Sequence, residues 1–216
     1  MKLALLGLVP LLLWELSGGD IMAARLFGTP LGFALRDHWW LSTVLHDGAR
    51  QLAWVGAAVL AVNVVWPLTP ALTRRERLWW LLATLTGAAL VPLIKQMSLT
   101  SCPWDLTEFG GRAEHLSHWL QFKPWGVADG AGGRCFPSGH ATSAFCFFSG
   151  SFALRRAYPR AARWWTAAVL LLGLLLGAVQ LARGAHFPSH TLWSAWICFS
   201  LNAALAPWLR AAPRPR

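Results

Sequence analysis

The sequence predicts an all-α fold, that of a polytopic membrane protein whose helices, about six of them, cross the bilayer as one bundle. Of its 216 residues, 56% are hydrophobic and only 13% are charged, too few charges to cover a soluble domain of this length. The apolar residues form long runs rather than alternating patterns. Tryptophans gather at the ends of these runs, where an interfacial belt places them: Trp79, Trp80, Trp164, Trp165 and Trp208. We expect a single membrane-embedded domain over residues 1–216.

The apolar runs predict spans over residues 3–17, 52–68, 78–94, 138–154, 164–181 and 191–208. The first run follows Lys2 and resembles a signal-peptide core, but no small-residue cleavage site follows it, so we expect it to remain as a span. Residues 18–50 mix charges with aromatics and predict an interfacial amphipathic helix on the outer side. Residues 96–136 predict a polar loop, and residues 183–190 a short connector.

Basic residues are concentrated between the spans, in the segments 73–77 (TRRER) and 155–163 (RRAYPRAAR) and in the tail at Arg210, Arg214 and Arg216. If the spans alternate in direction, these segments share one face with Lys2, and the positive-inside rule makes that face cytoplasmic. The net charge of +10 is explained in this way without nucleic acid, which we do not expect as a partner. The loop and the connector then face outward, which in a bacterial inner membrane is the periplasm.

The four cysteines include no CxxC pair. Cys102 and Cys135 lie in the polar region, whereas Cys146 and Cys198 lie within apolar runs. If the polar region faces an oxidising periplasm, a Cys102–Cys135 disulfide can form. Two unpaired thiols are the alternative.

The stretch Pro137-Ser138-Gly139-His140 ends the polar loop and opens a span. Proline suits the first turn of a helix, and the next two residues leave backbone N–H groups unobstructed at the positive end of the helix dipole, which favours an anion. His140 follows closely enough to transfer a proton to that anion. An ordinary helix start would also explain these four residues.

The predicted topology brings several basic side chains to the same outer surface as this stretch: Lys95, Arg134, His140, Arg183, His186 and His190. Such a set suits phosphoryl transfer, which needs cations for the phosphate oxygens, a nucleophile and an acid for the leaving oxygen. Histidine can be the nucleophile or the acid near neutral pH.

We predict neither a metal ion nor a cofactor. The nearby carboxylates are too scattered for a magnesium cage: Asp105, Glu108, Glu114 and Asp129. Asp105 is expected to cap or turn the loop. His115 and His118 have the spacing of half a metal site, but a solvated loop helix is the preferred interpretation.

These motifs together resemble the type 2 phosphatidic acid phosphatase (PAP2) superfamily, whose signature runs K-x6-R-P, P-S-G-H, S-R-x5-H-x3-D. The matching segments here are Lys95 with Pro103, then 137–140, then His186 with His190. The resemblance implies that His186 is the nucleophile and that His140 protonates the leaving group. It also implies that Lys95, Ser138 and Gly139 hold the phosphate oxygens.

Three positions depart from the signature. Cys102 and Gln180 each stand where the family has arginine, and His190 stands where it has the aspartate that orients the nucleophile. Arg134 and Arg183 are candidate substitutes for the missing arginines. A neutral His190 can accept a hydrogen bond from His186, but it does not stabilise an imidazolium as a carboxylate does.

The leading hypothesis is a metal-independent phosphatase that cleaves a lipid phosphomonoester or diphosphate through a phosphohistidine. The resemblance admits undecaprenyl diphosphate, phosphatidylglycerol phosphate, phosphatidate and lipid A phosphates as substrates. A lipid phosphotransferase differs only in the acceptor. Two further alternatives are a bis-histidine haem membrane protein, with His140 paired to His186 or His190, and an inactive membrane scaffold. The identity of the lipid and the oligomeric state stay open.

Overall fold

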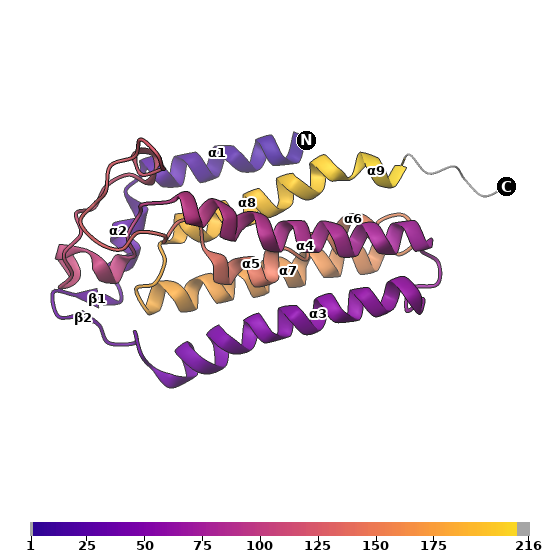
Figure 1. The fold of residues 1–216 in the computed structure, drawn as a ribbon, viewed down its shortest axis with the longest axis horizontal. Helices are drawn as coiled ribbons and strands as arrows, with labels where there is room; N and C mark the ends of the chain where they lie inside the picture. Colours follow the sequence, from indigo (N-terminus) through magenta and orange to yellow (C-terminus); the bar gives the residue numbers. More distant parts are fainter. Residues whose placement is uncertain (1, 211–216) are drawn as a thin grey trace.

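The computed structural model describes residues 2–210, and Arg214 and Arg216 of the basic tail lie outside them. The chain forms a helical bundle (Figure 1). Its α-helices are α1 (Lys2–Leu16), α2 (Gly19–Ala24), α3 (Gly48–Val65), α4 (Arg74–Met97), α5 (Gly139–Phe145), α6 (Phe148–Ala153), α7 (Pro159–Ala182), α8 (Pro188–Leu205) and α9 (Pro207–Arg210). A π-helical segment, η1 (Trp40–Asp47), leads directly into α3, and 3₁₀ turns η2 (Pro103–Asp105), η3 (Thr107–Phe109) and η4 (His118–Leu120) lie in the long loop.

Among residues 2–210, four helices are long and apolar enough to cross a membrane: Trp40–Val65, Arg74–Met97, Pro159–Ala182 and Pro188–Leu209. They correspond to the spans expected at 52–68, 78–94, 164–181 and 191–208, so the chain is an integral membrane protein. Each extends beyond its apolar run at one end or both, because helical hydrogen bonding continues into polar residues that the run excludes.

The other two expected spans differ from the prediction. α1 has 15 residues, fewer than the about 20 that a perpendicular span needs. A continuous span over 138–154 is wrong, because the helix is interrupted between α5 and α6. The carbonyl oxygen of Phe147 accepts a hydrogen bond from the indole Nε1 of Trp165 at 2.7 Å. The amide of Phe147 meanwhile bonds to the carbonyl of Ala144 at 3.0 Å, which tightens the turn.

Residues 18–50 are also not the single amphipathic helix that was expected. They form α2, an antiparallel hairpin of β1 (Gly28–Thr29) and β2 (Gly32–Phe33), and η1. Gly32 has a φ of 105°, which glycine adopts without strain and which allows the tight reversal. Phe33 packs on Phe109 of the long loop with ring centroids 5.0 Å apart, so the hairpin covers one end of the bundle.

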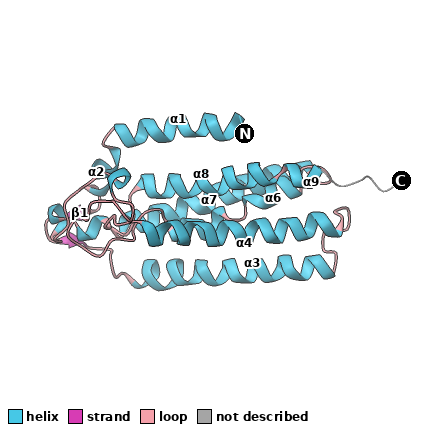
Figure 2. Ribbon diagram, turned by 45° about the horizontal axis from the view of Figure 1, so that its top comes forward, coloured by secondary structure: helices cyan, strands magenta, loops and turns pink. Residues whose placement is uncertain are grey.

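The bundle has α1 along one side and α3 along the other, with α4, α7 and α8 between them (Figures 1 and 2). α1 is fixed against α8, whose Trp196 donates an indole hydrogen bond to the carbonyl of Ala4 at 2.8 Å. The hairpin and the long loop lie at one end of the bundle. The α3–α4 and α6–α7 turns lie at the opposite end.

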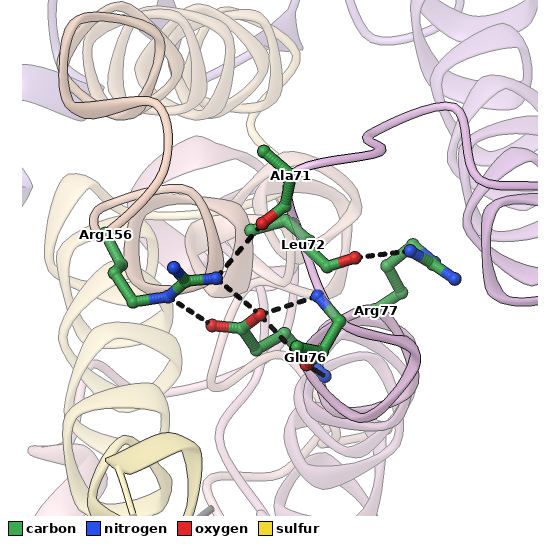
Figure 3. A network of polar contacts seen from close by, with 6 residues as sticks. Ala71, Leu72, Glu76, Arg77 and Arg156 are labelled. Carbon is green, nitrogen blue, oxygen red and sulfur yellow. Dashed lines mark hydrogen bonds and ion pairs between the residues drawn. The ribbon is translucent and has the colours of Figure 1, made fainter. Parts of the chain in front are cut away.

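The two basic segments meet at that opposite end (Figure 3). Thr73 caps α4 and forms a capping box with Glu76. The Glu76 carboxylate also accepts hydrogen bonds from Nε and Nη2 of Arg156, at 2.8 and 2.9 Å, and Arg77 donates to the carbonyl of Leu72. The segments 73–77 and 155–163 therefore share one face, as the charge pattern predicted.

Glycines on α7 allow its neighbours to approach closely. A Cβ atom on Gly173 would lie 2.1 Å from a ring carbon of Phe145 in α5, and one on Gly177 would lie 2.3 Å from the methyl group of Thr191 in α8. Small residues at helix interfaces are a usual means of close packing in membranes. α7 is thus the helix against which both site-bearing helices are packed.

Gly173→Leu is expected to lower the thermal midpoint in detergent by roughly 5 °C or more, because overpacking costs about 1–3 kcal/mol and α5 must shift. Gly48→Leu is the matched control, since a Cβ there meets nothing within 4 Å. Equal midpoints for the two variants would show that α5 and α7 are not tightly packed.

Candidate active site

Segments far apart in the sequence meet at the loop-covered end of the bundle. Lys95 lies in the last turn of α4, and its Nζ is 3.9 Å from the position of a Cβ on Gly139, the first residue of α5. The next residue, His140, has its ring centroid 6.0 Å from that of His186, which precedes α8. The basic side chains of three motifs are therefore close to one another.

His186 and His190 are in direct contact. Their Nδ1 atoms are 3.4 Å apart, and each residue is 2% exposed. A hydrogen bond at this distance requires one of the two Nδ1 atoms to carry a proton. If His186 is the donor, its Nε2 keeps a free lone pair, which is the form that a nucleophile needs.

Burial lowers the pKa of His186 well below its usual range, and the positive charges of Lys95, His190 and His140 lower it further. A histidine with a depressed pKa is neutral at pH 7. The environment of His186 therefore favours the unprotonated, nucleophilic imidazole.

Ser138 is arranged differently from the expectation. The helix begins at Gly139 rather than at Pro137, and Ser138 is the residue before it. Its backbone N–H is not unobstructed, because it donates to the carbonyl of His190 at 3.1 Å. Its Oγ, however, is buried and has no hydrogen-bond partner among the described residues. Ser138 therefore offers a ligand its hydroxyl group, not its amide.

The two arginines proposed as substitutes have different environments. Arg183 is buried, and its Nη1 lies 3.3 Å from Oε1 of Gln180, so it reaches the space of the missing arginine. Its Nε donates to the carbonyl of Arg36 at 2.8 Å. Arg134 has a φ of 61° and an exposed side chain, and the structure does not bring that side chain to the histidines.

The Cys102–Cys135 disulfide is present, with Cα atoms 5.2 Å apart. One of its two cysteines, Cys102, stands at the position where the family signature has arginine. The Sγ of Cys135 lies 3.5 Å from Nδ1 of His186, so the cross-link fixes the long loop against this histidine. Cys146 and Cys198 are buried free thiols, as expected from their place in apolar runs.

Reduction of this disulfide, or its removal by Cys102→Ala with Cys135→Ala, is expected to destabilise the protein. The chain-entropy argument gives roughly 3–4 kcal/mol for a loop of this length. Activity should also fall on the order of tenfold, because one wall of the His186 site is released. Thermal unfolding and phosphate release with and without reductant measure both effects. A Cys146→Ala variant is the control, and unchanged activity after verified reduction would contradict the expectation.

Cys135, His186 and His190 place their potential ligand atoms within 4.8 Å of one another. The sulfur of Cys135 is oxidised in the disulfide and is not a thiolate, so two imidazoles remain, and these contact each other. A structural zinc site uses four ligands and a catalytic site three. This donor set does not suit zinc.

Two polar residues near His190, His118 and Glu15, were not predicted from the sequence to belong to the site. His118 is buried and stacked on Phe136 with centroids 3.9 Å apart, so its assignment to a solvated helix is wrong, although His115 is exposed. The carboxylate of Glu15 accepts hydrogen bonds from two indoles nearby. An acidic residue within an apolar run was the available signal, since such residues are usually functional.

Asp105 and Asp129 organise the loop. Asp105 accepts a hydrogen bond from the amide of Cys102 at 3.3 Å, as its expected capping role requires. Asp129 accepts bonds from the amide and hydroxyl of Ser101 and from the side chain of Gln121, at 2.7–2.8 Å. Both carboxylates therefore have structural partners.

Comparison with family models matches residues 77–214 to the PAP2 superfamily, and the chain belongs to this family. The match begins in α4 and includes Lys95, the stretch 137–140, His186 and His190, which confirms the resemblance drawn from the motifs. Members are generally phosphatases that act on phosphate esters, lipid phosphates among them, and the chain is a membrane protein of this class. Comparisons with curated proteins and with solved structures gave no match.

Proposed function

We propose that the protein is a membrane lipid phosphatase that hydrolyses a lipid phosphomonoester or diphosphate through a phosphohistidine on His186, without a metal ion. The observation that supports the proposal is the Nδ1–Nδ1 contact of His186 with His190. With His186 as the donor, its Nε2 is the unprotonated ring nitrogen, and the ring of His140 lies 6.0 Å away between centroids. The substrate classes are undecaprenyl diphosphate, phosphatidylglycerol phosphate, phosphatidate and lipid A phosphates.

In the first step, Nε2 of His186 attacks phosphorus and forms a P–N bond. The P–O bond to the lipid breaks, and a protonated His140 gives its proton to the leaving oxygen. Lys95 and the hydroxyl of Ser138 stabilise the charge on the remaining phosphoryl oxygens. The proton on Nδ1 of His186 is shared with His190 while the phosphoryl group is bound.

In the second step, His140, now neutral, accepts a proton from a water molecule that attacks the same phosphorus. The P–N bond breaks, inorganic phosphate leaves, and His186 is again a neutral imidazole. His140 is thereby returned to its protonated form. The cycle consumes one water molecule and releases one lipid product and one phosphate.

A cavity of about 220 Å³ between α3, α4 and α5 supports a lipid substrate. Gly139 lines it together with apolar side chains that include Trp54, Pro92 and Phe147, and with Arg50. A phosphate beside Gly139 would thus have room for its apolar chain within the membrane region. With the topology predicted from the charge pattern, we expect the reaction at the outer face of a bacterial inner membrane.

The test is release of inorganic phosphate from each of the four lipid classes by purified protein in detergent with EDTA. A water-soluble phosphate monoester is the matched substrate control, and His186→Asn is the matched inactive protein. We expect release from at least one lipid and much slower release from the soluble ester. Transfer of phosphate to an added lipid instead of water would identify a phosphotransferase. No turnover of any lipid by folded protein would refute the proposal.

A further inference from the structure

A second cavity, of about 150 Å³, lies on another side of His190. It is bordered by Glu15 of α1, Asp20 of α2, Thr100, His115 and His118 of the long loop, and His190 itself. Its volume is sufficient for several water molecules. His190 therefore contacts His186 and also borders a polar space that the proposed chemistry does not use.

Glu15 brings a carboxyl group to this cavity. Burial, and to a smaller extent the charge of Asp20, raise its pKa, whereas the hydrogen bonds from Trp193 and Trp119 favour the carboxylate. Its side chain is 10% exposed and accepts hydrogen bonds from the indoles of Trp193 at 3.0 Å and Trp119 at 2.7 Å. Nε2 of His118 lies 3.5 Å away, but burial lowers the pKa of His118 to about 4, so it is neutral at pH 7. The two indole N–H groups orient the carboxylate without cancelling its charge.

Asp20, the other carboxylate of the cavity, is held differently. It accepts hydrogen bonds from the amide and hydroxyl of Ser189 in the first turn of α8, and from the indole of Trp14 at 2.8 Å. Its charge is thus located at the positive end of a helix, where it has a structural role. Glu15 is the better candidate for acting on His190.

We propose that Glu15 is a positioning residue for the His186–His190 pair: its carboxylate stabilises the proton that His190 accepts from His186, and so replaces the charge of the aspartate that the family has at position 190. This inference rests on the proposed function. The carboxylate acts across the cavity, through water. It lies on α1, outside the residues that match the family.

The proton involved is the one between the two Nδ1 atoms. As the P–N bond forms at Nε2 of His186, electron density leaves that ring and its Nδ1 proton moves toward His190. His190 then carries a positive charge. Lys95 of α4 and His186 repel this charge, as do His115 and His118 of the loop when they are protonated. Of the two carboxylates at the cavity, Asp20 is bound to the start of α8, which leaves Glu15 to balance this charge.

A double-mutant cycle tests the inference. Glu15→Gln should lower kcat on the order of tenfold with KM little changed, because a charge that acts on the reacting histidine is removed. In a His190→Asp protein, where position 190 has its own carboxylate, the same substitution should change kcat by less than about twofold. Glu108→Gln is the matched control, since this exposed carboxylate pairs with Arg25 at 2.6 Å. An equal loss of kcat in both backgrounds would reveal a merely structural role and overturn the proposal.

A second measurement does not depend on turnover. Nitrogen-15 NMR of histidine in the His186→Ala protein follows the protonation of His190 directly. Glu15→Gln is expected to shift the titration midpoint of His190 to lower pH, and Glu108→Gln to leave it unchanged. If the wild-type protein released no phosphate, the proposed function would fail, and this titration would still decide the inference. An unchanged midpoint in Glu15→Gln would contradict it.

Discussion

His186→Ala is expected to lower phosphate release about 10⁴-fold or more, because it removes the atom to which the phosphoryl group is transferred in the proposed mechanism. KM for the lipid should change much less, since the proposed phosphate ligands Lys95 and Ser138 are both retained. Single-turnover experiments with radiolabelled lipid phosphate, quenched within milliseconds, measure the covalent intermediate directly. Label on the protein should be stable in base and labile in acid, as a phosphoramidate is.

His38→Ala is the matched control, because this histidine, between the hairpin and η1, has an exposed side chain. It should keep both the activity and the labelled intermediate. Protein label that persists in His186→Ala would assign the nucleophile to another residue. Activity within about tenfold of wild type in His186→Ala would reject covalent catalysis at this position.

Lys95→Met is expected to reduce kcat/KM by about 10²–10³-fold, the usual cost of losing a group that stabilises charge in the transition state. Methionine keeps much of the volume and flexibility of lysine but lacks its charge. The Nζ of Lys95 lies beside Gly139, where the phosphoryl oxygens would be held. Steady-state kinetics on the best lipid substrate measures the loss.

Lys123→Met is the control for general charge effects, because Lys123 is an exposed residue of the long loop. It should alter kcat/KM by less than about threefold. A similar loss in both variants would indicate that Lys95 attracts anionic lipid from a distance rather than contacting the phosphate. Lys95→Arg should restore part of the activity, because the charge returns with a different shape.

The four long spans could be predicted from the sequence because the length of an apolar run is a local property. The common end of the two basic segments could be predicted for the same reason, since it depends on where Arg74, Arg75 and Arg155 lie along the chain (Figure 3). The interruption between α5 and α6 could not be predicted from the sequence. It depends on a hydrogen bond from Trp165, which reaches Phe147 only after α7 has packed against α6.

Some features of the candidate site could likewise be predicted from the sequence, and others could not. Lys95, His140 and His186 could be selected because each belongs to a short motif whose residues are close in sequence. The hydrogen bond from the Ser138 amide to the carbonyl of His190 could not be predicted, because it depends on how α8 approaches α5. The buried environment of His118 likewise depends on Phe136 and on the packing of α1 against α8.

The shortness of α1 has a consequence for the membrane around the protein. Its 15 residues extend about 22 Å, whereas the hydrocarbon layer of a typical bilayer is about 30 Å thick. Lipids beside α1 must compress, or the helix must be drawn toward one leaflet, and either response is a form of hydrophobic mismatch. Glu15 is the second-last residue of this helix, and its carboxylate accepts a hydrogen bond from Trp193 of α8, the helix that carries His190, so a tilt of α1 would act on α8 as well. We therefore expect the acyl-chain length of the host membrane to influence this end of the bundle.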